Sequence, residues 1–131
     1  MSETITADFA DLPVRRDIRV NRGRSFEERF TVSLSIEGAA AQAIDFSQAT
    51  ACELRFRDSE GTVECFDLAE HAASGKVTAR LSPTQTGTLV AGRQDWEMYF
   101  QFPSGSTDFP AGATFSLFEG VADVRTMISA E

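Results

Sequence analysis

The sequence is short of positive charge. Its 131 residues include 12 Lys and Arg against 20 Asp and Glu, so the formal net charge is −8. Nucleic acids and anionic membranes are bound nonspecifically by an excess of cations, which replaces their counterions. The acidic balance argues against both partners, and we expect no nucleic acid and no membrane to be bound.

Long apolar runs are also absent. No window approaches the roughly 18 uninterrupted apolar residues that favour a membrane-spanning helix. The N-terminus, MSETITADFADLP, carries acids and no basic segment followed by an apolar stretch, so it does not read as a signal peptide. We therefore expect synthesis in a cytoplasm without a signal-peptide route out of it.

Residues that carry catalysis or hold metals are scarce. The single histidine, His71, falls in an expected loop, and no Gly-x-Ser-x-Gly elbow accompanies it. Two separated cysteines, one distant histidine and scattered carboxylates match no zinc or iron spacing, and no glycine-rich phosphate loop is present. The segment 58–61, DSEG, fits a hairpin turn better than a calcium loop of about twelve residues. We expect no enzyme activity, no catalytic residue, no metal and no cofactor.

The two cysteines, Cys52 and Cys65, flank an expected hairpin. A three-residue turn over 59–61 opposes Cys52 to Leu68, whereas a two-residue turn over 59–60 opposes Cys65 to Leu54. Neither register sets the two sulfur atoms directly opposite each other, and the register stays open. We expect two free thiols that act as small apolar residues, which fits a reducing compartment.

What the sequence does have is alternation with a period of two. Between Ser25 and Glu37 one parity is apolar apart from Glu28, and the other parity is polar throughout. The apolar row consists of Phe26, Phe30, Val32, Leu34 and Ile36. Because successive strand side chains point to opposite faces, this segment is predicted to be a strand with one face on a core.

The remaining segments complete an all-β pattern. Further strands are predicted at 14–21, 50–57, 62–68, 76–81, 94–102 and 113–128. Apolar residues on both parities of 62–68 indicate either a bulge or two buried faces, and a second bulge is expected at Gly120. The Pro- and Gly-rich segment 103–112 is predicted to be a long loop.

One helical turn is expected after the strand at 76–81. Ser82 is a capping residue, Pro83 takes the first helical position and Gln85 follows the cap by three, with Leu89 as the apolar anchor. The fold class is therefore all-β, an antiparallel immunoglobulin-like β-sandwich of about seven strands with one short helical turn. We divide the chain into an N-terminal arm, 1–13, and a single β-sandwich domain, 14–131.

Two features suggest interfaces. Residues 1–13 lack regular periodicity but hold Ile5, Phe9 and Leu12 among acids, so they either cover the domain's own surface or dock on a neighbouring subunit. Most phenylalanines look inward; Phe109 in the long loop and Phe118 on the last strand are the exceptions.

Half of the basic residues fall between positions 15 and 29. They are Arg15, Arg16, Arg19, Arg22, Arg24 and Arg29. They form either a solvated strand face or a contact patch for an acidic surface, which residues 95–131 offer with six acids against Arg125 alone. A basic end and an acidic end would allow head-to-tail stacking in a ring. The candidate interface residues are Ile5, Phe9, Leu12, Arg15, Arg16, Arg19 and Phe109.

Short motifs recur in an order that resembles a known family. They are Arg22-Gly-Arg-Ser-Phe26, Ile44-Asp-Phe-Ser47, Leu81-Ser-Pro-Thr-Gln-Thr86 and Glu119-Gly-Val-Ala-Asp-Val124. This order resembles the small β-sandwich modules of tailed-bacteriophage virions and is similar to the N-terminal domain of phage baseplate upper proteins. Phe46 stands where that family usually has Leu, and Arg24 where its openings often have an acid.

The resemblance implies a non-enzymatic virion structural protein at the tail tip or baseplate, acting through subunit interfaces. Its partners would be other virion proteins and the chain itself in a symmetric homo-oligomer, and it would be made in the host cytoplasm. Two alternatives stay open: a capsid decoration (cement) protein on the outer head surface, and a host carbohydrate- or protein-binding β-sandwich module.

Overall fold

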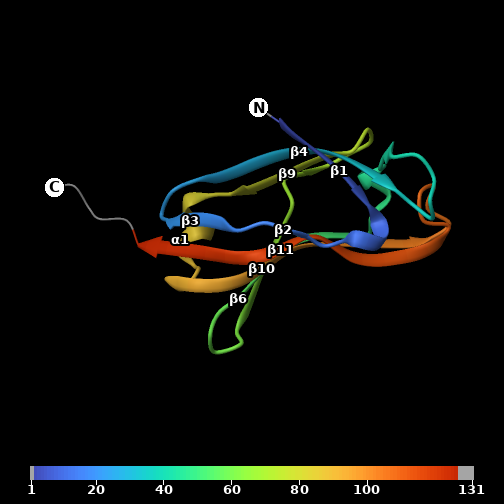
Figure 1. Ribbon diagram of the computed structural model, residues 1–131. Coiled ribbons are helices and arrows are strands. Elements are labelled where there is room, and N and C mark those ends of the chain that lie inside the picture. Colours follow the sequence, from blue (N-terminus) through green and yellow to red (C-terminus); the bar gives the residue numbers. More distant parts are fainter. Residues whose placement is uncertain (1, 127–131) are drawn as a thin grey trace.

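Strand alternation folds this chain into two facing β-sheets with an apolar layer between them. The computed structural model describes residues 2–126, and the expected end of the last strand at 127–128 lies outside that range. Figure 1 shows the two layers, with β4 and β9 in one and β10 and β11 in the other. The all-β sandwich expected from the sequence is confirmed.

The first sheet, sheet A, has the order β1 (Ser2–Asp8), β4 (Phe26–Ser35), β9 (Lys76–Leu81) and β8 (Glu70–His71). The two-residue strand β5 (Gln42–Ala43) pairs with the end of β4. Residues expected to lack regular structure thus form β1, which runs parallel to β4. The alternation of this strand is weak because Thr4, Thr6 and Asp8 occupy its outward parity and the other parity has only Ile5 and Ala7 as apolar residues.

The second sheet, sheet B, begins with β2 (Val14–Arg15) and β3 (Ile18–Arg22), which both pair with β11 (Ala111–Thr126). Beyond β11 follow β10 (Gly92–Ser104), β6 (Ala51–Arg57) and β7 (Val63–Asp67). Both β2 and β3 run parallel to β11, so the sandwich is mixed and not purely antiparallel as expected. The cause is the N-terminal segment, which follows an edge of each sheet in turn.

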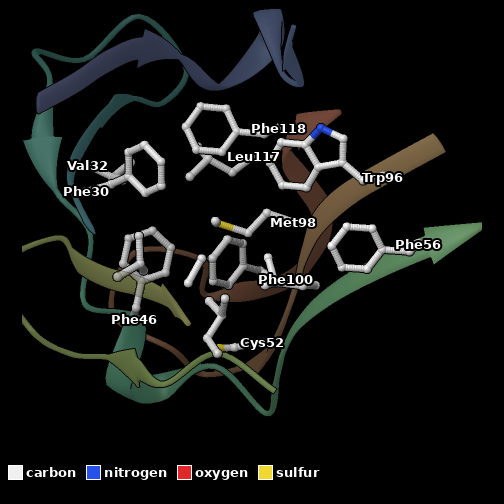
Figure 2. Packing of buried hydrophobic residues seen from close by; sticks show 14 of the residues in the cluster. Phe30, Val32, Phe46, Cys52, Phe56, Trp96, Met98, Phe100, Leu117 and Phe118 are labelled. Atoms are coloured by element: carbon white, nitrogen blue, oxygen red, sulfur yellow. The ribbon is translucent and has the colours of Figure 1, made fainter. Parts of the chain in front are cut away.

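Phenylalanine rings fill the space between the sheets. Figure 2 shows Phe30 and Phe118 facing each other across the layers, and Phe46 beside Phe100, with centroid separations of 4.9 and 4.7 Å. Phe118 is fully buried and Phe109 is 6% exposed, so neither is the outward exception expected from the sequence. Phe109 turns inward because its loop folds its ring onto Phe102 and Phe115.

Three short helical segments close the ends of the sandwich: η1 (Phe9–Asp11), η2 (Phe46–Gln48) and α1 (Pro83–Gly87). The expected helical turn is confirmed in α1, whose Ser82 and Gln85 exchange both bonds of a capping box. Leu89 is buried beneath it, as expected.

The β6–β7 hairpin adopts the register of a three-residue turn. Arg55 pairs with Cys65, and the Leu68 N–H donates to the Cys52 carbonyl at 3.0 Å. Both thiols are free, as expected: Cys52 is buried, which raises its pKa to about 12, and Cys65 is exposed. The strand has neither the bulge nor the two buried faces that its sequence indicated. It is an exposed edge, and the hairpin projects from the two layers in Figure 1.

The bulge in β11 lies three residues before the expected position. Met98 pairs with Phe118 but Tyr99 pairs with Ser116, which leaves Leu117 as the extra residue. The bulge lets Leu117 and Phe118 both reach the core. Gly120 has a different role, because a side chain there would overlap the carbonyl of Arg16.

The loop after β10 is shorter than the expected 103–112, since β10 extends through Ser104 and β11 begins at Ala111. Pro103 is tolerated in the strand because its missing N–H falls on the β6 side, beyond the last β6 pairing at Ala51.

We expect Gly120→Ala to lower the free energy of unfolding by about 2 kcal/mol, because the added methyl group would displace backbone rather than a flexible side chain. Gly87→Ala is the matched control: Gly87 has open space around it, so that variant should be neutral or slightly more stable. Urea unfolding of both variants checks this; equal midpoints would contradict it.

Candidate interaction surfaces

A partly buried arginine, Arg16, joins the two sheets at one edge of the sandwich. Arg16 follows β2, and its guanidinium contacts the carboxylate of Glu28 and both oxygens of Glu3, at 3.1 and 3.2 Å for the latter. The same guanidinium lies over the rings of Phe30 and Phe118, 5.0 and 5.6 Å from their centroids. Its side chain is 25% exposed. We call this set the Arg16 clasp.

Burial by itself would lower the pKa of Arg16, but the hydrogen bonds and charges of Glu28 and Glu3 outweigh it and raise that pKa. The clasp also explains the break in the apolar row of β4. Glu28 points inward because Arg16 enters from the opposite sheet to meet it.

The backbone of Arg16 is held as firmly as its side chain. Its N–H donates to the Glu119 carbonyl at 3.0 Å, and its own carbonyl accepts from the Trp96 indole at 2.7 Å. Asp17 then accepts the Val121 N–H at 2.8 Å. These contacts divide the strand expected at 14–21 into β2 and β3.

The apolar candidates of the N-terminal segment pack on their own domain. Ile5, Phe9 and Leu12 are half-buried against the core, and the Phe9 ring lies 5.2 Å from that of Phe109 and 5.1 Å from that of Phe115. Phe9, Leu12 and Phe109 therefore cover one side of the sandwich, and β1 lies on the edge of its own sheet A.

The other two candidates, Arg15 and Arg19, are exposed. The Arg15 side chain is 68% exposed and pairs with Asp17 at 3.0 Å. Arg19 stands opposite Asp123 in the β3–β11 register. The structure separates three arginines that are neighbours in the sequence: Arg16 is enclosed in the clasp, and Arg15 and Arg19 face solvent.

The acids of the last third do not form a separate acidic end. Asp95 pairs with Arg57 at 3.1 Å and Glu97 with Arg55 at 3.6 Å. Asp123 pairs with Arg125 at 2.9 Å. The first two pairs form because β10 lies beside β6, whose outward side chains include Arg55 and Arg57.

The outer face of sheet B carries a shallow pocket of about 480 Å³. A row of side chains in register crosses β7, β6, β10, β11 and β2: Cys65, Arg55, Glu97, Glu119 and Arg15. The Arg55 guanidinium also lies 3.6 Å from the centroid of the Tyr99 ring. In this row the two arginines flank a pair of neighbouring acids, so the face offers both signs of charge to a contacting surface.

Within residues 2–126, no group of three or more His, Cys, Asp or Glu side chains is placed to hold a metal ion. No helix in the same range has the length and apolar character needed to cross a membrane.

The fold and these surfaces define a β-sandwich module whose sheet B has a charged outer face. No protein-family model matches the chain, and no curated protein does. Among solved structures, the chain is similar to the N-terminal domain of phage TP901-1 ORF48, with a TM-score of 0.53 and 14% identity over 95% of this chain and 98% of that one. At this identity the likeness establishes the fold, and it confirms the resemblance to a phage β-sandwich module.

We expect Arg16→Met to lower the free energy of unfolding by about 2 kcal/mol, because Glu28 would stay half-buried without its partner. Adding Glu28→Met should recover at least about 1 kcal/mol of that loss, since no half-buried carboxylate then remains unpaired and the Glu3 side chain is 50% exposed. Arg15→Met is the control and should cost less than about 0.5 kcal/mol, as an exposed pair. Urea unfolding of both single variants and of the double variant measures this. If the losses of unfolding free energy from Arg16→Met and Glu28→Met add up in the double variant, the clasp is refuted.

Asp17 should contribute to acid sensitivity. Its bond from the Val121 N–H, followed by the pair with Arg15, lowers its pKa below the usual 3.8 in the folded state. A lowered folded-state pKa gives stability that is present above pH 3.8 and is lost as the pH falls through the folded value. Asp17→Asn should therefore flatten the stability profile below that pH. A variant profile parallel to the wild type in acid titration would show that Asp17 plays no such role.

Proposed function

We propose that this chain is a non-enzymatic structural protein of a tailed-bacteriophage virion, an assembly component of the tail tip or baseplate that acts through its subunit interfaces. The supporting observation is the likeness to a phage domain over 95% of this chain and 98% of that one. The short motifs of the sequence point to the same group of proteins independently of the coordinates.

The described surface is consistent with this proposal. Its charged groups form ion pairs within and between strands, as Arg55 does with Glu53 on its own strand and with Glu97 on the neighbouring β10. Such paired charges can match a complementary surface on a partner. We propose other virion proteins and further copies of the same chain as partners, arranged with the closed symmetry usual for homo-oligomers.

Quantitative mass spectrometry of purified particles tests the proposal. Peptides of this chain, measured against those of the major capsid and tail-tube proteins, should give about a few to a few dozen copies per particle, because rings on the tail axis are small. Hundreds of copies would replace the tail assignment with capsid decoration. Absence from particles would reject the virion role and favour a host binding module.

A further inference from the structure

The free edge of sheet B at β7 has unpaired backbone groups. Asp58 donates to the Thr62 carbonyl and Leu68 to the Cys52 carbonyl, both at 3.0 Å, which fixes the alternation of the hairpin ladder. In an antiparallel pair, every second residue therefore directs its N–H and C=O away from the partner strand. On β7 these residues are Val63, Cys65 and Asp67.

This edge carries few of the features that prevent strand addition. Exposed edges are usually blocked by proline, by charged side chains, above all lysine, by a bulge or by a covering loop. Of these, β7 carries the acids Glu64 and Asp67, which repel an acidic strand but attract a basic one. The five residues of β7 contain neither proline nor lysine, and their pairing with β6 is regular. Val63 is 51% exposed. The edge is open to a partner.

The same edge is acidic. Between Asp58 and Leu68 the chain has four acids and no base. Asp58 is occupied by the turn, where it accepts the N–H groups of Glu60 and Thr62. Within residues 2–126, the side chains of Glu64 and Asp67 take part in no ion pair.

The opposite edge of sheet B is basic. The strand order places β2 and β3 at one end of the sheet and β7 at the other, and Figure 1 shows β3 and β2 along β11 while the hairpin hangs beyond β10. Between positions 14 and 24 the chain has five arginines against one acid. Arg19 and Arg24 are exposed and form no ion pair with any residue that the structure describes.

We infer that β7 of one copy docks against the β2–β3 edge of a second copy, so that the chain assembles head to tail. The guanidinium groups of Arg19 and Arg24 would then meet the carboxylates of Glu64 and Asp67 and the free carbonyls of β7. The occupant is a second copy because one chain carries both complementary edges, whereas two β7 edges would oppose acid to acid.

Such a contact is heterologous: each copy uses a different edge on either side, so the assembly grows into a closed ring or an open filament. The inference deepens the proposed function, on which its biological setting rests. Association is measured on the purified chain without phage particles, so the inference can fail while the proposed function still holds.

Sedimentation velocity over a concentration series tests it. The wild type should associate as concentration rises. The pair Arg19→Glu with Arg24→Glu, and the pair Glu64→Arg with Asp67→Arg, should each weaken association about tenfold or more, because attraction becomes repulsion. The four substitutions together restore opposite charges across the contact and should bring association back.

Two controls match the charge changes away from both edges: Lys76→Glu with Arg80→Glu, and Glu37→Arg with Glu70→Arg. Neither pair should weaken association by more than about twofold. A wild type that stays monomeric, controls that weaken it equally, or a fourfold variant that folds without associating would overturn the inference. Circular dichroism verifies folding. If the chain associates but is missing from particles, only the virion proposal fails.

Discussion

The architecture depends on the ion pairs that one arginine forms with two carboxylates at an edge of the sandwich. Arg16 leaves sheet B and reaches the carboxylates of Glu3 and Glu28 on sheet A, over two aromatic rings. Glu28, whose side chain is 25% exposed, could not face the interior without it, since an unpaired charge in a desolvated position is costly. The clasp therefore fixes where β1, β2 and β4 lie relative to one another.

The clasp also determines which side chains of the N-terminal segment are enclosed and which are exposed. Its strands run along one edge of each sheet, and Gly120 lets the backbone of Arg16 approach β11 closely. As a result, Arg15 and Arg19 remain on the outside, where they give one end of sheet B its positive charge. The other end gains negative charge from the β6–β7 hairpin, so polarity runs across the sheet and not along the sequence.

Much of this could be predicted from the sequence, because local signals carry it. The alternation of β4 and β10, the capping box of α1 and the free thiols all follow from residues close together in the chain. Contacts between residues that are distant in the chain could not be predicted in this way. The inward Glu28 was visible as a break in a row, but its partner Arg16 could not be identified from spacing. The partners of Asp95 and Glu97 could not be identified from the sequence either, because they are Arg57 and Arg55 on β6, which is distant in the chain.

The pairing of β3 with β11 also limits the order in which the molecule forms. Ile18 pairs with Ala122, and Arg22 with Thr126, so β3 cannot pair until β11 has been synthesised. Contacts between such distant residues are slow to form because the intervening chain must first be ordered. On the ribosome, sheet A and the β6–β10 pairing can be assembled earlier, whereas the basic edge is completed only after β11 has emerged. Newly made chains would thus expose the acidic edge before its complement exists.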